Sequence, residues 1–196
     1  MRATGSTATH SASIGTDRAA GLSPGRSDLS RSPTMGRDHE DSLAVVVYRE
    51  DGVWQSAVLP ERLADDLDGL VAVLRQQPAE NGSIGLVNVA DEFCVAVRVR
   101  GDDVRLLLSD VTAAVAWDLA RQVVDRLGLE PPGDDDLEDV WPAGDLSIFS
   151  DLGVDEVEMG AVLSDLDAYA DEMLGAVAGR LGFAEVYDRA LEAAAH

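Results

Sequence analysis

The stretch FCVAVRVRGDDVRLLL, residues 93–108, decides the fold class of this chain. From Phe93 to Arg100, larger apolar side chains alternate with small or charged ones, a two-residue period typical of a β-strand with one core face. Gly101-Asp102 then turns the chain, and a further strand follows with apolar residues at Val104, Leu106 and Leu108. The stretch therefore predicts two neighbouring strands, the first of them half-buried.

Upstream of this stretch, the sequence predicts three more strands and one helix. The continuous apolar run of residues 43–48 is typical of a strand buried on both faces. Asp51-Gly52 supplies the positive φ angles of a tight hairpin turn into a strand over residues 53–58, and residues 84–89 form another strand. Between them, Pro60 suits the first turn of a helix. The apolar face of that helix consists of Leu63, Leu67, Leu70, Val71 and Leu74.

Downstream, the pattern becomes helical. Asp110 is placed to cap a helix that Gly128 closes, with a buried side at Val111, Val115, Leu119, Val123 and Leu127. Residues 129–154 are predicted to be irregular, and three short helical patterns occupy about residues 155–194. The element order ββαβββα predicts an α+β fold: a mostly antiparallel five-stranded sheet with helices on one face and a C-terminal group of short helices.

Composition divides the chain into two parts. Residues 1–40 are rich in Ser, Thr, Gly, Ala and Arg and are predicted to form a disordered tail, and residues 41–196 to form one domain. Met35, just before the first apolar run, is an alternative start. The chain has no apolar run near the roughly 20 residues that span a bilayer, no apolar signal core and a single cysteine. These features predict a cytoplasmic protein without an intramolecular disulfide.

The charge is strongly acidic and unevenly distributed. The chain carries 15 basic residues, all arginine, and 37 acidic ones, for a net charge of −22. Residues 1–40 hold five arginines and four acidic residues, a net charge of +1, which leaves −23 for residues 41–196. Because nucleic-acid affinity comes largely from cations that contact phosphates, we expect no direct nucleic-acid binding, and no membrane binding either. The charge favours either solubility alone or attraction to a basic protein.

Catalytic patterns are missing from the sequence. The three histidines are His10, His39 and His196, all outside the patterned region, so neither a Ser-His nor a Cys94-His pair is expected. Without lysine there is no phosphate-loop motif, and we expect neither catalysis nor a cofactor. An acidic loop could hold a hard cation or be simply solvated, although its spacing does not match a calcium loop; it comprises Asp134, Asp135, Asp136, Glu138 and Asp139.

The tryptophans are the other candidates for function. Trp54, Trp117 and Trp141 each stand near polar or acidic residues, and Trp141 lies in the least regular stretch. Aromatic anchors ringed by polar groups are favoured at protein interfaces, whereas the alternative is that each covers the core. The candidate partner-contact residues are therefore Trp54 and Trp141, together with the five acidic loop residues.

Several segments resemble a known family. These are residues 45–52 (VVVYREDG), 59–78, 107–114 (LLSDVTAA), 144–153 (GDLSIFSDLG) and 171–174 (DEML). They are similar to the actinobacterial tRNA adenosine deaminase-associated proteins, over about residues 43–192. Ala170 stands where that family is expected to carry proline. The resemblance implies association with a deaminase and supplies no catalytic residues. The H-x-E and P-C-x-x-C motifs of the zinc deaminases themselves are absent.

The sequence thus favours a non-catalytic, acidic protein-interaction module, for which the resemblance implies a tRNA adenosine deaminase as partner. Two alternatives stay open. One is a stand-alone regulatory or structural domain with only a genomic link to the deaminase, and the other is a carboxylate metal-binding protein.

Overall fold

The structure, a computed structural model, describes residues 42–133, 140–165 and 167–195, which belong to one compact unit, residues 36–196. Their strands form a single antiparallel sheet in the order β2-β1-β3-β4-β5-β6. The strands are β1 (Leu43–Glu50), β2 (Val53–Val58), β3 (Ser83–Val89), β4 (Phe93–Arg100), β5 (Asp103–Leu108) and β6 (Ala143–Gly144). The α+β class and the antiparallel sheet are confirmed.

The helices form two groups. The first group comprises α1 (Leu67–Arg75) and α2 (Asp118–Leu127), with short 3₁₀ helices η2 (Glu61–Ala64) and η3 (Val111–Val115) before them. The second comprises η5 (Ser150–Leu152), α3 (Glu156–Leu163), α4 (Ala170–Leu181) and α5 (Ala184–Ala194). Among the described residues, none of these helices has the length and apolar character needed to cross a membrane.

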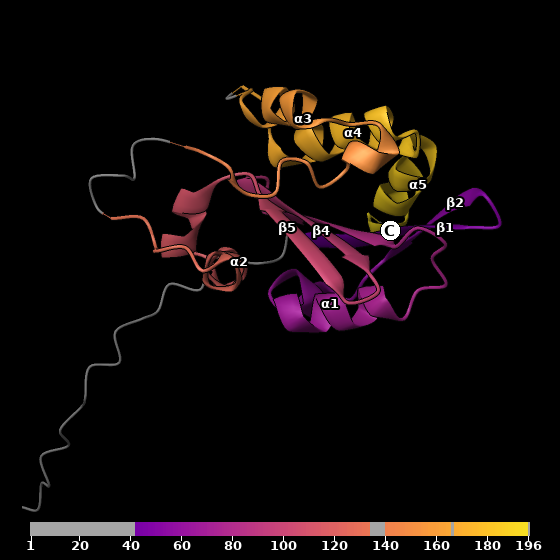
Figure 1. Ribbon diagram of the computed structural model, residues 1–196, viewed down its shortest axis with the longest axis horizontal. Helices are drawn as coiled ribbons and strands as arrows, with labels where there is room; N and C mark the ends of the chain where they lie inside the picture. The colour runs from indigo at the N-terminus through magenta and orange to yellow at the C-terminus, as the bar shows by residue number, and fades with distance from the viewer. Residues whose placement is uncertain (1–41, 134–139, 166, 196) are drawn as a thin grey trace, which may run out of the picture. The chain divides into compact units, whose positions relative to one another are not determined.

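The two helical groups cover opposite faces of the sheet, so the prediction of helices on one face was wrong (Figure 1). Phe93, Val95 and Val97 of β4 pack in one core with α1 and α2. Cys94 and Ala96, which point the other way, pack in a second core with α3, α4 and α5. The predicted half-buried character of β4 was therefore also wrong: small side chains on its second face are what allow helices to pack there.

The first hairpin forms as predicted. Asp51 and Gly52 adopt φ angles of 51° and 77°, as a two-residue turn that follows the strand twist requires. β1 is paired on both sides, with β2 and β3, which agrees with its continuous apolar sequence.

Each of the two helices predicted before residue 128 is divided into a short 3₁₀ helix and an α-helix. Asp66 accepts a hydrogen bond from the Gly69 amide at 2.9 Å, so α1 begins after it and residues 61–64 form a separate 3₁₀ turn. Asp110 caps η3 rather than α2, accepting from the Thr112 amide at 2.8 Å. Val115 is consequently 53% exposed, contrary to the prediction. Gly128 does close α2, with φ 69°.

The sixth strand was missed because it has no local pattern. β6 is only two residues long and exists because Ala143 and Gly144 pair with Leu108 and Leu107 of β5. Gly144 has φ 112°, and a Cβ atom there would lie 2.2 Å from the Leu106 carbonyl oxygen. Glycine is therefore required at this position, although only the folded backbone reveals the reason.

Candidate interaction surface

Two of the seven predicted contact residues, Trp54 and Trp141, lie in the described part of the chain. Trp54 lies on β2, at one end of the strand order, and Trp141 lies two residues before β6, at the other. Trp54 mainly covers the core: its ring packs edge-on against Phe183 at 5.1 Å between centroids, and the Arg49 guanidinium lies 5.6 Å over it. Trp141 is 37% exposed beside the exposed Val140. Asp134, Asp135, Asp136, Glu138 and Asp139 lie outside the described residues.

Trp117 is a core residue. It is 3% exposed, stacks edge-on with Phe93 at 5.8 Å, and donates its indole N–H to Glu92 at 3.1 Å. A buried indole needs such a partner, which explains why an acidic residue stands near it in space.

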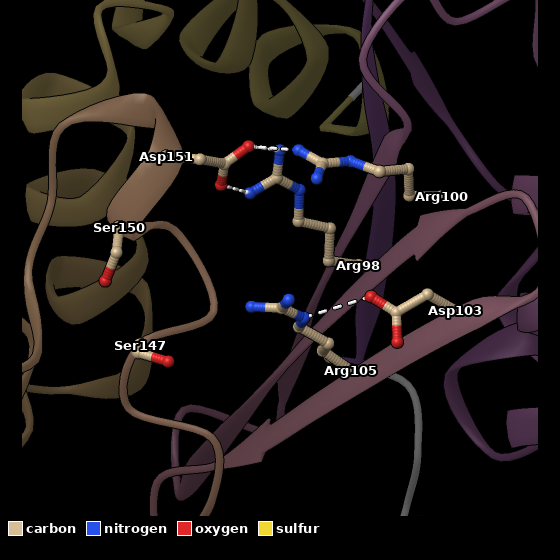
Figure 2. Close-up of a pocket in the computed structure, with 7 residues that line it drawn as sticks. All are labelled: Arg98, Arg100, Asp103, Arg105, Ser147, Ser150 and Asp151. Atoms are coloured by element: carbon tan, nitrogen blue, oxygen red, sulfur yellow. Dashed lines mark hydrogen bonds and ion pairs between the residues drawn. The ribbon is translucent and has the colours of Figure 1, made fainter.

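An arginine cluster was not predicted. The alternation of β4 and β5 places Arg98, Arg100 and Arg105 on the sheet face that carries the C-terminal helices, around a cavity of about 160 Å³. Figure 2 shows the guanidinium groups of Arg98 and Arg100 converging on Asp151, while Arg105 extends toward the loop that carries Ser147 and Ser150. The register that sets Arg98 opposite Arg105 follows from the Gly101-Asp102 turn, which is the signal that could have revealed the cluster.

Arg98 is the buried centre of this cluster. Only 4% of its side chain is exposed, and it donates to the carbonyl oxygens of Ile148 at 2.9 Å and Asn81 at 3.3 Å. It also forms a two-pronged pair with the Asp151 carboxylate, which Arg100 contacts as well. The hydrogen bond from Arg98 is the main reason that the pKa of Asp151 is lowered. The cluster thereby ties the loop before α3 to the β4–β5 hairpin.

The arginine cluster lacks the groups that catalysis would need. Arg105 pairs with Asp103 at 3.1 Å and Asp145 at 3.5 Å, so three arginines face three carboxylates and the charge is balanced. The Ser147 hydroxyl donates to Asp145 at 2.6 Å, and the seven residues that line the cavity include no imidazole or thiol to activate it. We therefore assign the residues around this cavity a structural role rather than a catalytic one.

Two titratable side chains of the described residues, Cys94 and Tyr187, are buried in the second core. Cys94 is 4% exposed, and burial raises the pKa of its thiol to about 11. Burial also raises the pKa of Tyr187. Among the described residues, no group of three or more His, Cys, Asp or Glu side chains is arranged to hold a metal ion.

A groove lies between α3 and α4. We call it the α3–α4 groove; its volume is about 390 Å³. Its apolar lining comes from Ala161, Val162, Ala168, Met173 and Ala176, and its charged lining from Asp165, Asp167, Glu172 and Arg180. Tyr169, in the segment that enters α4, is 67% exposed. The lining of the groove is therefore mixed, with five apolar side chains, three carboxylates and one guanidinium.

The groove lies in the most one-sidedly charged part of the chain. No basic residue occurs between Arg126 and Arg180, whereas residues 151–172 contain eight acids: Asp151, Asp155, Glu156, Glu158, Asp165, Asp167, Asp171 and Glu172. Capping explains some of them. Asp155 and Glu158 cap α3 reciprocally, and Glu172 accepts from the Tyr169 amide at 3.0 Å at the start of α4. This cap starts the helix at Ala170 without a proline.

Comparison with known proteins identifies the family. The family model for Rv3753c-like tRNA adenosine deaminase-associated protein matches residues 42–184. The chain belongs to this family. Protein Rv3753c of Mycobacterium tuberculosis is 40% identical over 150 residues, which cover 76% of this chain and 86% of that protein. No solved structure matches the chain. The resemblance to the actinobacterial deaminase-associated family is therefore confirmed, and its match includes the α3–α4 groove.

Proposed function

We propose that this protein is a non-catalytic interaction module that docks a basic surface of a tRNA adenosine deaminase into the α3–α4 groove. The observation that carries the proposal is the groove itself. Its lining combines five apolar side chains with three carboxylates against one basic residue, Arg180, and the sequence contains no other basic residue from residue 127 to residue 188. The family description supplies the candidate partner.

Charge complementarity makes this partner physically reasonable. An enzyme that binds tRNA must present cations to the phosphates, and such a surface attracts an acidic domain. Docking there would compete with tRNA or assist its exchange. The buried state of Cys94 and the balanced arginine cluster support a role without catalysis, because neither presents an activated nucleophile.

The test is co-purification of the full chain with the tRNA adenosine deaminase of the same genome. We expect capture at about 0.05 M salt and loss of the complex at about 0.5 M, because screening weakens attraction between exposed charges. Absence of the deaminase at low salt would reject this partner.

Matched variants locate the contact. Asp165→Lys combined with Asp167→Lys reverses two charges at the groove, and Asp102→Lys combined with Glu130→Lys makes the same change at two exposed positions away from it. We expect the first pair to reduce affinity at least about tenfold and the second to reduce it much less. Equal effects would mean that only net charge matters, and the proposed groove would be wrong.

A further inference from the structure

The two edges of the sheet differ in how they are protected from pairing with another strand. At one edge, β6 covers Leu107 and Leu108 of β5, and the Asp145 amide continues the pairing by donating to the Leu106 carbonyl at 2.8 Å. The rest of β5 carries Asp103 and Arg105. A short covering strand and charged side chains are common means of preventing edge-to-edge association.

Within the part of the chain that the structure describes, the opposite edge, β2, has neither a covering strand nor a charged side chain of its own. Its sequence VWQSAV contains no charged residue and no proline, in a chain whose residues are 27% charged. Its pairing with β1 runs without a bulge from Val45–Val58 to Glu50–Val53. Among the described residues, no strand pairs with the outer side of β2. Such an edge is suited to receiving another strand.

The hydrogen bonds to β1 show which backbone groups are available. The Leu59 amide donates to the Ala44 carbonyl at 2.8 Å, which makes Leu59–Ala44 a hydrogen-bonded pair. Because such pairs alternate along an antiparallel ladder, Gln55 and Ala57 also face β1. The N–H and C=O groups of Trp54, Ser56 and Val58 therefore point away from the sheet.

Helix α5 packs beside this edge strand. The Ser56 hydroxyl donates to the Val186 carbonyl at 2.6 Å, which holds the helix beside the strand (Figure 1). A groove of about 220 Å³ runs between them, with Val58, Val186, Ala190 and Ala193 as its apolar lining and Arg189 as its charged one. Val58 is 36% exposed there.

We propose that a second copy of this chain pairs antiparallel with β2 across a two-fold axis at Ser56. In this register Ser56 faces its own equivalent, and Trp54 faces the partner's Val58, an aromatic and β-branched pair that sheets favour. No charged residue of either strand meets a like charge. Of the charged residues of α5, Arg189 lines the groove beside β2, whereas Glu185, Asp188 and Glu192 are not part of that lining.

The salt dependence of this dimer is opposite to that of deaminase docking, and the inference does not depend on the proposed function. Two chains of −22 repel each other, and salt screens that repulsion. Sedimentation equilibrium of the 20.7 kDa full chain should show a dimer that tightens on the order of tenfold between about 0.02 and 0.5 M NaCl. A monomer at every salt and at millimolar concentration would overturn the proposal.

Proline variants test the edge itself. Val58→Pro removes an outward N–H and no bond to β1, so we expect at least about tenfold weaker dimerisation with a near-native melting temperature. Ala57→Pro removes an N–H that faces β1 and should instead lower the melting temperature. A Val58→Pro dimer as tight as the wild type would contradict the proposed edge.

Cysteine cross-linking tests the register without disturbing the strand. The proposed register sets Gln55 opposite the partner's Ala57 in a non-hydrogen-bonded pair, where Cα atoms lie about 4.5 Å apart, within disulfide range. A mixture of Gln55→Cys and Ala57→Cys chains should form a mixed disulfide dimer under mild oxidation. A mixture of Gln55→Cys and Val53→Cys chains should not, since these positions are four residues out of register. Equal yields would refute the proposed pairing.

Discussion

Replacing Asp151 by asparagine should destabilise the protein by about 2–3 kcal/mol. Breaking a buried ion pair by removing one partner typically costs about 3–5 kcal/mol, because a buried charge is left uncompensated. Here Arg98 is the buried partner, with 4% of its side chain exposed, whereas Asp151 is 41% exposed. Solvent screening on the Asp151 side, and the Ile148 and Asn81 carbonyls that Arg98 retains, place the expected cost below that range.

Thermal and urea unfolding measure this effect directly. A loss of about 2–3 kcal/mol corresponds to a melting temperature lower by about 5–10 °C for a domain of this size. Asp103→Asn is the matched control, because Asp103 is 56% exposed and pairs with the exposed Arg105; we expect a loss of less than about 1 kcal/mol there. If the two variants lose the same stability, the buried position of Arg98 is not what makes the pair important.

A double-mutant cycle isolates the coupling between the two side chains. Arg98→Met combined with Asp151→Leu should recover part of the loss of either single variant, since neither charge is then left unmatched. Strict additivity of the two losses would refute the proposed pairing.

The same pair predicts a pH dependence. Arg98 lowers the pKa of Asp151 in the folded state. The ion pair therefore contributes fully to the free energy of unfolding above the unfolded-state pKa of about 3.9, and this contribution is lost as the pH falls through the folded-state pKa. The stability difference between wild type and Asp151→Asn should therefore be constant from about pH 5 to 7 and shrink below about pH 4. If the stability difference between the wild type and Asp151→Asn grows as the pH falls, the proposed effect of Arg98 on Asp151 is wrong.

Three further predictions follow from local geometry. Because burial raises the pKa of Cys94 to about 11, the native thiol should react with a disulfide reagent at pH 8 at least about 100-fold more slowly than the urea-unfolded chain; similar rates would show that it is accessible. Asp66→Ala should cost about 1 kcal/mol in urea unfolding by removing the cap of α1, and no loss would show that the cap contributes nothing. Gly144→Ala should speed hydrogen exchange at the Asp145 amide because a Cβ would clash with Leu106, whereas Gly160→Ala, on an open helix face, should be neutral or stabilising by about 0.5–1 kcal/mol. Unchanged exchange in Gly144→Ala would mean that β6 tolerates the side chain.

Local patterns predicted most of the elements. The hairpin at Asp51-Gly52, the strands that begin near residues 43, 53, 84, 93 and 103, and the C-terminal helices all lie where the sequence indicated them. In these segments a turn residue or an apolar period is sufficient, because neighbours along the chain provide the contact. The helix breaks at Asp66 and at Ala116–Trp117 were missed because the apolar spacing continues through both.

The sequence predicted the acidic charge of the candidate site but not its position. The acidity of the domain was evident from composition, but the expected contacts at Trp54 and Trp141 lie at opposite ends of the strand order, and their role stays a prediction. The α3–α4 groove was missed because Ala161, Val162 and Met173 resemble ordinary helix-packing residues when read along the chain. The arginine cluster was missed because Arg98 looked like the polar side of a half-exposed strand.

The sequence by itself determined the α+β class, the acidic character and the absence of recognisable catalytic motifs, since composition and short-range periodicity are properties of the chain alone. Only the tertiary structure decided which faces of the sheet are covered and which strands stand at the edges of the described sheet. Both depend on where α3, α4 and α5 pack after the chain turns back, which brings Asp151 onto Arg98 across more than fifty residues of sequence. A two-residue strand such as β6 has too few local interactions to form alone, so it is defined entirely by the strand beside it.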